Sequence, residues 1–263
     1  TRRVDRTRTV TALVTGGASG IGHEVAGRLR DAGHNVVVWD LSSETGSADI
    51  ACDVSDPDAV SAAMEQTVRD HGVPTRVVTS AGIGASGLLL KQQLAEWDRV
   101  LAVNLTGTWL TIRAAAQAMV DAGVRGSMVA VSSISGTVAD RDMGAYCVSK
   151  AGVDMLVRVA AVEWGGYGIR VNAVGPGVTQ TPMLVDAQRL PGWVAGLSER
   201  TALGGLGAAA DVAGAIVGVL ELPWVTGQVV HADGGLALHS PIDAYGQLQR
   251  VLARGKHSME GKP

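Results

Sequence analysis

An apolar run, a glycine-rich turn and a helical stretch follow one another within the first 32 residues. Residues 10–15 form the β-rich run, and Gly16, Gly20 and Gly22 stand in the turn behind it. Glycines at such a turn let the backbone approach a phosphate closely, and the N–H groups at the start of the helix attract the anion. This combination predicts a nucleotide-binding α/β fold.

The strand–helix alternation continues along the chain. We expect further strands over 35–40, 50–54, 76–80, 127–132, 170–174 and 228–231. Helices are expected over 57–71, 144–164 and 211–220, and residues 94–121 are expected to be helical, as one helix or two. Residues 180–203 are expected to be irregular and partly helical. Such alternation predicts a single-domain Rossmann-type α/β fold, a doubly wound parallel sheet with helices on both faces.

The expected domain spans residues 10–237, between a solvated Arg-rich arm at 1–9 and a C-terminal extension at 238–263. In the extension, Ser240 and Pro241 favour a helix start. Apolar residues then follow at helical spacing: Ile242, Tyr245, Leu248, Val251 and Leu252. We expect this helix to pack on the core or on a neighbouring subunit, beside the substrate entrance.

Composition excludes several classes of protein. A formal net charge of −3 and a pI of about 6.0 do not favour binding to nucleic acid or anionic membranes. No apolar run is long enough to span a membrane. Cys52 and Cys147 form no CxxC motif and no His cluster accompanies them, so we expect no metal site, reduced thiols and a cytoplasmic protein.

Asp40 closes the second expected strand. A carboxylate there can accept hydrogen bonds from both ribose hydroxyls of an adenosine and repels a 2′-phosphate. No Arg or Lys stands in the glycine turn, and Leu41 follows Asp40. The sequence therefore favours NAD over NADP, although Asp40 could also be a turn or cap residue. Asp53 is a second candidate for the adenine edge, or else a helix-entry residue.

Tyr146 and Lys150 lie four residues apart at the start of an expected helix, and so on one face of it. A nearby ammonium favours the phenolate, which makes the tyrosine a candidate proton carrier near neutral pH. The spacing alone is common, and an exposed helix pair is the plain alternative.

The glycine turn, Tyr146-x-x-x-Lys150 and Ser133, thirteen residues before the tyrosine, together resemble the short-chain dehydrogenase/reductase family. The resemblance covers about residues 10–237. It implies a nicotinamide cofactor, a homotetramer and a catalytic tetrad of Asn104, Ser133, Tyr146 and Lys150. In these roles Tyr146 transfers the proton, Ser133 holds the substrate oxygen, Lys150 lowers the pKa of Tyr146 and Asn104 holds a water.

The cofactor contacts that the resemblance implies lie mainly in the turns that follow the expected strands, up to residue 181. They are Gly16, Ser19, Gly20, Ile21, Gly22, Asp40, Leu41, Asp53, Val54, Ala81, Gly82, Tyr146, Lys150, Pro176, Gly177, Val178 and Thr181. Where the family usually has Asn-Asn-Ala-Gly, this chain has Thr79-Ser80-Ala81-Gly82. Residues 140–142, Asp-Arg-Asp, replace common small apolar residues, and a solvated turn is favoured there over a charged pocket mouth.

The sequence thus predicts an NAD-dependent enzyme that interconverts a secondary alcohol and a ketone, with Tyr146 as general acid or base. Its partners are a small-molecule alcohol or ketone and further copies of the chain. One alternative is a 3-oxoacyl thioester reductase, which Asp40 opposes because NADPH is the usual reductant of synthesis. A nucleotide sensor without turnover is an alternative of another class. The substrate itself is left open.

Overall fold

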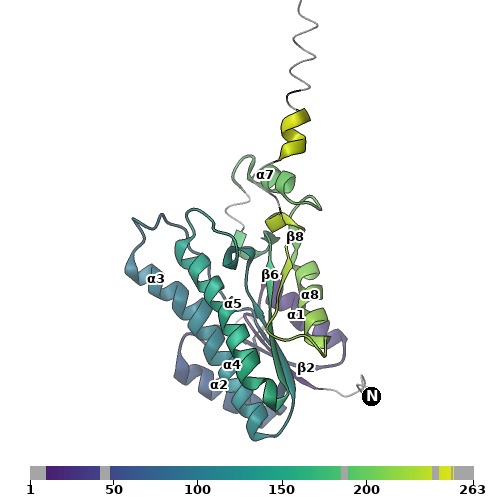
Figure 1. Cartoon of the computed structure of the whole chain (residues 1–263). Helices are drawn as coiled ribbons and strands as arrows, with labels where there is room; N and C mark the ends of the chain where they lie inside the picture. Colours follow the sequence, from purple (N-terminus) through teal and green to yellow (C-terminus); the bar gives the residue numbers. More distant parts are fainter. Residues whose placement is uncertain (1–9, 42–47, 185–188, 239–242, 250, 252–263) are drawn as a thin grey trace, which may run out of the picture.

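The computed structural model describes residues 10–41, 48–184, 189–238, 243–249 and 251. Its centre is a seven-stranded parallel sheet of order β3-β2-β1-β4-β5-β6-β9 (Figure 1). The strands are β1 (Thr11–Thr15), β2 (Asn35–Asp40), β3 (Ile50–Ala51), β4 (Pro74–Thr79), β5 (Gly126–Val131), β6 (Ile169–Pro176) and β9 (Val229–Ala232). This order confirms the expected Rossmann-type α/β fold.

Helices cover both faces of the sheet (Figure 1). One face carries α1 (Gly20–Asp31) and α8 (Ala209–Glu221), which pack on each other. The other carries α2 (Pro57–His71), α4 (Gly107–Asp121) and α5 (Gly144–Trp164), with α3 (Leu94–Leu101) leading into α4. The arrangement encloses two apolar layers, one on each side of the sheet.

Strand residues divide between these layers by alternation, because successive side chains point to opposite faces. On β1, Leu13 belongs to the layer under α2, α4 and α5, whereas Ala12 and Val14 belong to the layer under α1 and α8. Both faces are buried, so the strands read as continuous apolar runs rather than as alternating ones.

Most expected boundaries agree with the structure to within two residues, and local chemistry explains them. Asp56 caps α2, accepting hydrogen bonds from the N–H groups of Asp58 and Ala59, and Pro57 fills the first turn. Gly33, with φ of +82°, ends α1. The helical stretch expected over 94–121, as one helix or two, is α3 and α4 joined by a π-helical turn at Ala102–Thr106. The third strand is shorter than expected.

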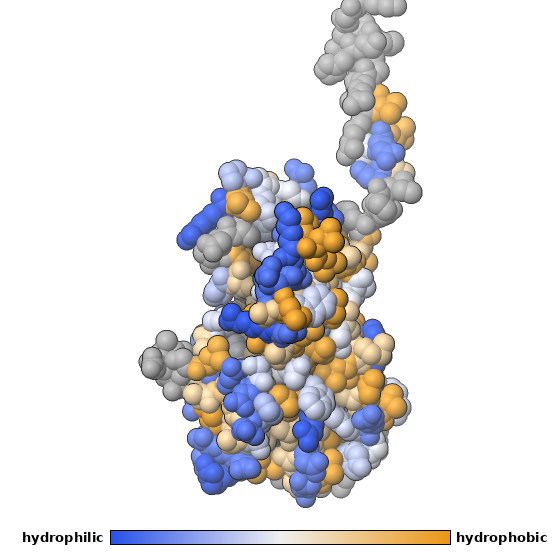
Figure 2. Space-filling view, turned by 90° about the vertical axis from the view of Figure 1, so that its left-hand side faces the viewer, coloured by the Kyte–Doolittle hydropathy of each residue, from blue (hydrophilic) through white to orange (hydrophobic). Residues whose placement is uncertain are grey.

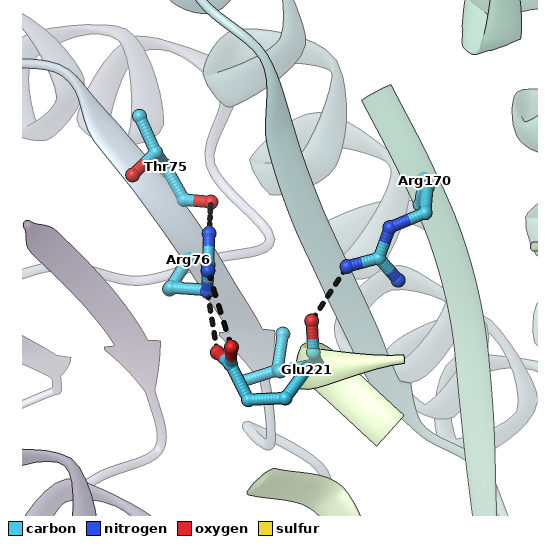
Figure 3. Close-up of polar contacts among 5 residues, drawn as sticks. Thr75, Arg76, Arg170 and Glu221 are labelled. Carbon is cyan, nitrogen blue, oxygen red and sulfur yellow. Dashed lines mark hydrogen bonds and ion pairs between the residues drawn. The ribbon is translucent and has the colours of Figure 1, made fainter. Parts of the chain in front are cut away.

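Two arginines hold the C-terminal end of α8 against the sheet (Figure 3). Arg76 of β4 pairs with the Glu221 carboxylate at 2.8 Å, and Arg170 of β6 donates to the Leu220 carbonyl at 2.6 Å. Positive groups at a helix C-terminus donate hydrogen bonds to its free carbonyls and interact favourably with the negative end of the helix dipole.

The segment after β6 is irregular, as expected. It contains the short sheet of β7 (Thr179–Gln180) and β8 (Gly207–Ala208) and the helix α7 (Trp193–Arg200). Short 3-10 turns also lie along the chain, at Ile134–Gly136 (η2), Gly165–Tyr167 (η3), Pro182–Leu184 (η4) and Leu236–Leu238 (η5).

The C-terminal extension is helical over 244–249. This helix stands clear of the body of its own chain (Figures 1 and 2), and Tyr245, Leu248 and Val251 are exposed. The residues expected to start the helix, Ser240 and Pro241, lie outside the described residues, as do Ile242, Leu252 and the arm at 1–9. Within the described residues, no helix is long and apolar enough to cross a membrane.

Candidate active site

Every candidate segment lies at the carboxyl edge of the sheet. The glycine turn follows β1, Asp40 ends β2, Gly82 comes after β4, Ser133 follows β5 and Pro176 ends β6. Parallel strands place these ends on one edge, where a doubly wound sheet binds its ligands. The sequence-predicted residues are therefore brought to one region by the topology.

The glycine turn is built for a phosphate. Gly16 has φ of +66°, and a Cβ there would lie 2.5 Å from the backbone nitrogen of Ala81, so only glycine fits between β1 and the segment after β4. Ser19 is the N-cap of α1, yet its side chain makes no capping hydrogen bond. Among the described residues, the N–H groups at the start of α1 thus stay available to an anion.

The two candidate adenosine acids differ in their partners. Asp40 accepts hydrogen bonds from the backbone of Ala18 at 3.0 Å and Leu41 at 2.8 Å, so its carboxylate is fixed beside the glycine turn. Asp53 accepts from the backbone and hydroxyl of Ser55 at 2.9 and 2.7 Å. That second pattern is the one expected of a helix-entry turn.

The segment after β6 closes over the glycine turn. A Cβ at Gly20 would lie 3.5 Å from Thr181 Cγ2, which places Thr181 beside the start of α1. Gly177 packs on Asp233, because a Cβ at Gly177 would lie 2.8 Å from its Cα. Pro176, Gly177, Val178 and Thr181 therefore belong to the segment that borders the glycine turn at the carboxyl edge of the sheet; their cofactor contacts stay a prediction.

Ser133, Tyr146 and Lys150 meet where α5 begins behind β5. Ser133 is buried, and its side chain hydrogen-bonds Tyr146. The Lys150 ammonium lies 5.6 Å from the centroid of the Tyr146 ring and donates to the Val131 carbonyl at 2.9 Å. The tyrosine–lysine pair is thus largely buried rather than an exposed helix pair.

Burial dominates the electrostatics of this pair. It raises the pKa of Tyr146, against a hydrogen bond from Ser133 that lowers it, while the charge of Asp140 raises it further. The pKa of Tyr146 in this cofactor-free structure is therefore shifted opposite to the direction expected from Lys150. Burial also lowers the pKa of Lys150 to about 8, against an opposing effect of Asp154.

Asn104 is fully buried in the π-helical turn. Its amide accepts from the Ile83 N–H at 2.8 Å and donates to the Ile83 carbonyl and the Ser149 hydroxyl at 2.9 and 3.1 Å. A Cβ at Gly82 would lie 3.3 Å from Asn104 Oδ1 and 3.7 Å from Lys150 Nζ. Asn104 thus fixes the segment after β4 beside Lys150; the water expected there stays a prediction.

Several contacts of the site were not expected from the sequence. They are the Val131 carbonyl, Ser149, Ile83, Asp154 and the pair Ser135–Asp140. Two of them had a sequence signal: Ser149 lies three residues after Tyr146 on the same helix, and Asp140 belongs to the charged segment 140–142. Met183 is 54% exposed and lies near Gly84. Within the described residues, no group of three or more His, Cys, Asp or Glu could hold a metal.

Comparisons with known proteins agree with this geometry. Residues 16–237 match a family model described as enoyl-(acyl carrier protein) reductase. The chain is 39% identical over 256 residues to (3R)-3-hydroxyacyl-CoA dehydrogenase of Homo sapiens, covering 88% of this chain and 97% of that one. It is 37% identical over 185 residues to D-threitol dehydrogenase of Mycolicibacterium smegmatis, covering 65% and 71%.

A similar solved structure is a short-chain type dehydrogenase/reductase from Mycobacterium marinum. It has 32% sequence identity and a TM-score of 0.81, and the match covers 86% of this chain and 95% of that one. The similarity therefore extends over nearly the whole sheet and its site edge.

Proposed function

Because the chain belongs to the short-chain dehydrogenase/reductase family, we propose that it is an NAD-dependent enzyme that interconverts a secondary alcohol and a ketone. As a member of this family it is an oxidoreductase acting on hydroxyl or carbonyl groups. One observation supports the finer proposal above others: Ser133, Tyr146 and Lys150 meet at the edge that Asp40 and the glycine turn also border.

The side chains divide the work of alcohol oxidation. Ser133 donates a hydrogen bond to the substrate oxygen and holds it against the Tyr146 hydroxyl. Tyr146 as phenolate accepts the hydroxyl proton as the carbonyl forms, and returns a proton in the reduction. Lys150 offsets the cost of a buried phenolate by its charge. When bound, the nicotinamide supplies the hydride acceptor or donor.

The choice of NAD rests on Asp40. The backbone bonds from Ala18 and Leu41 hold its carboxylate at the end of β2. A ribose with free hydroxyls can donate to that carboxylate, whereas a 2′-phosphate would meet a like charge. The preference for NAD is supported by this fixed charge, and Leu41 beside it is 71% exposed.

A second candidate is oxidation of a 3-hydroxyacyl thioester, favoured by the 39% identity to (3R)-3-hydroxyacyl-CoA dehydrogenase. The leucines after β4, Leu88, Leu89 and Leu90, are exposed near α5 and would suit an acyl chain. The chemistry at Ser133 and Tyr146 is the same for both substrates.

We also propose a homotetramer in a reducing, cytoplasmic setting. Exposed apolar residues on α4 and α5, among them Trp109 and Val162, support assembly. The free thiols Cys52 and Cys147 are consistent with reducing conditions.

The test is NADH formation at 340 nm with a panel of secondary alcohols and 3-hydroxybutyryl-CoA, run with NAD and NADP. We expect turnover with NAD, and in Tyr146→Phe a loss of at least about 100-fold in kcat with NADH affinity retained. Tight NADH binding by the wild type without turnover of any substrate would instead favour a nucleotide sensor. A higher kcat/KM with NADP would refute the Asp40 argument.

A further inference from the structure

The loop between β5 and α5 places a carboxylate within hydrogen-bonding distance of Ser135, two residues after Ser133. Ser135 donates from its hydroxyl to Asp140 Oδ2 at 2.6 Å, and its backbone N–H donates to the Ser133 hydroxyl at 3.1 Å. A continuous chain of hydrogen bonds therefore leads from Ser133 through Ser135 to Asp140. Ser133 and Ser135 are buried, whereas Asp140 is exposed.

The main chain of Asp140 is anchored as well. Its carbonyl accepts from the Met143 N–H at 3.3 Å and lies 4.0 Å from the Cys147 sulfur. Met143 and Cys147 flank the first turn of α5, which carries Tyr146. The turn expected at 140–142 is present, with Asp142 at φ of +79°, yet the same turn holds the Asp140 carboxylate at the site.

The carboxylate has unused capacity. Within the described part of the chain, Oδ1 of Asp140 has no hydrogen-bond partner and no cation pairs with the group. The charge reaches the reacting group, because Asp140 acts on the pKa of Tyr146. An ionised carboxylate only accepts hydrogen bonds. A second hydroxyl on the substrate satisfies it, whereas a carboxylate or phosphate there is repelled.

We propose that Asp140, held by Ser135, is the specificity residue that accepts a second substrate hydroxyl, and that the substrate is a vicinal diol or polyol. This rests on the proposed function. One hydroxyl is placed between Ser133 and Tyr146, and the hydroxyl on the adjacent carbon donates to Asp140. A mono-alcohol uses only the first position, and the carbonyl of an acyl thioester offers Asp140 no donor.

The test compares kcat/KM with NAD for butane-2,3-diol and butan-2-ol in the wild type and three variants. In Asp140→Ala, the ratio of the diol value to the butan-2-ol value falls about tenfold, as expected for losing a hydrogen bond to a charged acceptor. Ser135→Ala lowers the diol-to-alcohol ratio in the same direction. Asp142→Asn, two residues along the same turn, leaves the ratio unchanged.

The ratio is the readout because removing the Asp140 charge also acts on Tyr146, equally for both substrates. An unchanged ratio in folded Asp140→Ala and Ser135→Ala overturns the proposal. So does a wild type that oxidises 3-hydroxybutyryl-CoA far faster than the diol, although the dehydrogenase function then stands. Absence of turnover with all three substrates would overturn the proposed function itself.

Discussion

Lys150 and Asp154 are two buried groups one helical turn apart on α5. Asp154 is 4% exposed, and within the described residues its Oδ1 has no hydrogen-bond partner. Burial raises the pKa of Asp154, against lowering effects of Ser132, Arg158, His231 and Lys150. In turn the Asp154 charge raises the pKa of Lys150, which burial has lowered to about 8. The carboxylate therefore helps to keep Lys150 charged at neutral pH.

Asp154→Asn should reveal this effect in the pH profile of ketone reduction, in which Tyr146 starts protonated and becomes a phenolate. Lys150 must be protonated to support that phenolate, so kcat/KM for the reduction should fall above pH about 8 in the wild type. Without the Asp154 charge the pKa of Lys150 decreases, and this alkaline limb should move to lower pH by about 0.5–1 unit. Glu163→Gln, at an exposed acid on the same helix, is the control. A shifted melting temperature with an unmoved limb would leave Asp154 only a packing role.

At the level of elements, the end of α8 depends on the ion pair of Arg76 and Glu221 (Figure 3). Burial raises the pKa of Glu221, but the hydrogen bond and charge of Arg76 lower it more, so the net shift is downward. A carboxyl group with a lowered pKa in the folded state stabilises the fold at pH values above its pKa in the unfolded chain. This contribution is lost as the pH falls through its pKa in the folded state.

Glu221→Gln should therefore lower the melting temperature at pH 7, and the difference from wild type should vanish as pH falls below about 4. The carboxylate is 48% exposed, so solvent screens the pair. We expect a decrease of about 1–3 °C, from a pair contributing about 0.2–1 kcal/mol. Thermal melts at both pH values measure it, with Glu65→Gln on α2 as the control. An equal decrease at both pH values would contradict the electrostatic origin.

Elements were predictable from the sequence where a local signal marked them. Asp56-Pro57 and Gly33 set helix ends through capping and positive φ, and the apolar strand runs followed from burial on both faces. The positions of Ser133, Tyr146 and Lys150 in the site were also predictable, because the parallel topology brings these residues to one edge of the sheet. The direction of the Tyr146 pKa shift was not predictable, because burial by the tertiary fold is its largest cause and raises the pKa.

For the whole molecule, the question is which surface is covered in an assembly. On α5, Val148, Met155, Val159 and Val162 recur at helical spacing and are between 46% and 84% exposed, and Trp109 on α4 is 42% exposed. We call these five residues the α4–α5 face. The C-terminal helix offers a second apolar surface in Tyr245, Leu248 and Val251. Single folded chains rarely leave such contiguous apolar faces open to water.

Two variants separate the surfaces. Val162→Glu places a charge in the expected contact but costs the folded monomer little, because Val162 is 84% exposed. We expect light scattering to show an assembly with fewer subunits, because a buried unpaired charge opposes association. The melting temperature of the dissociated monomer should be the same as that of the wild-type monomer. Leu203→Glu, 86% exposed and outside the α4–α5 face, is the control.

Deleting the residues after Ala237 tests the C-terminal helix in the same way. If that helix packs on a neighbouring subunit beside the substrate entrance, the deletion changes the number of subunits in the assembly or the KM for the alcohol. Within the described residues, the helix stands clear of the body of the chain and its apolar side chains are exposed, so we expect their contact to come from another copy. If the truncated protein has the wild-type number of subunits and the wild-type KM, the extension serves neither purpose. Assembly would then depend on the α4–α5 face.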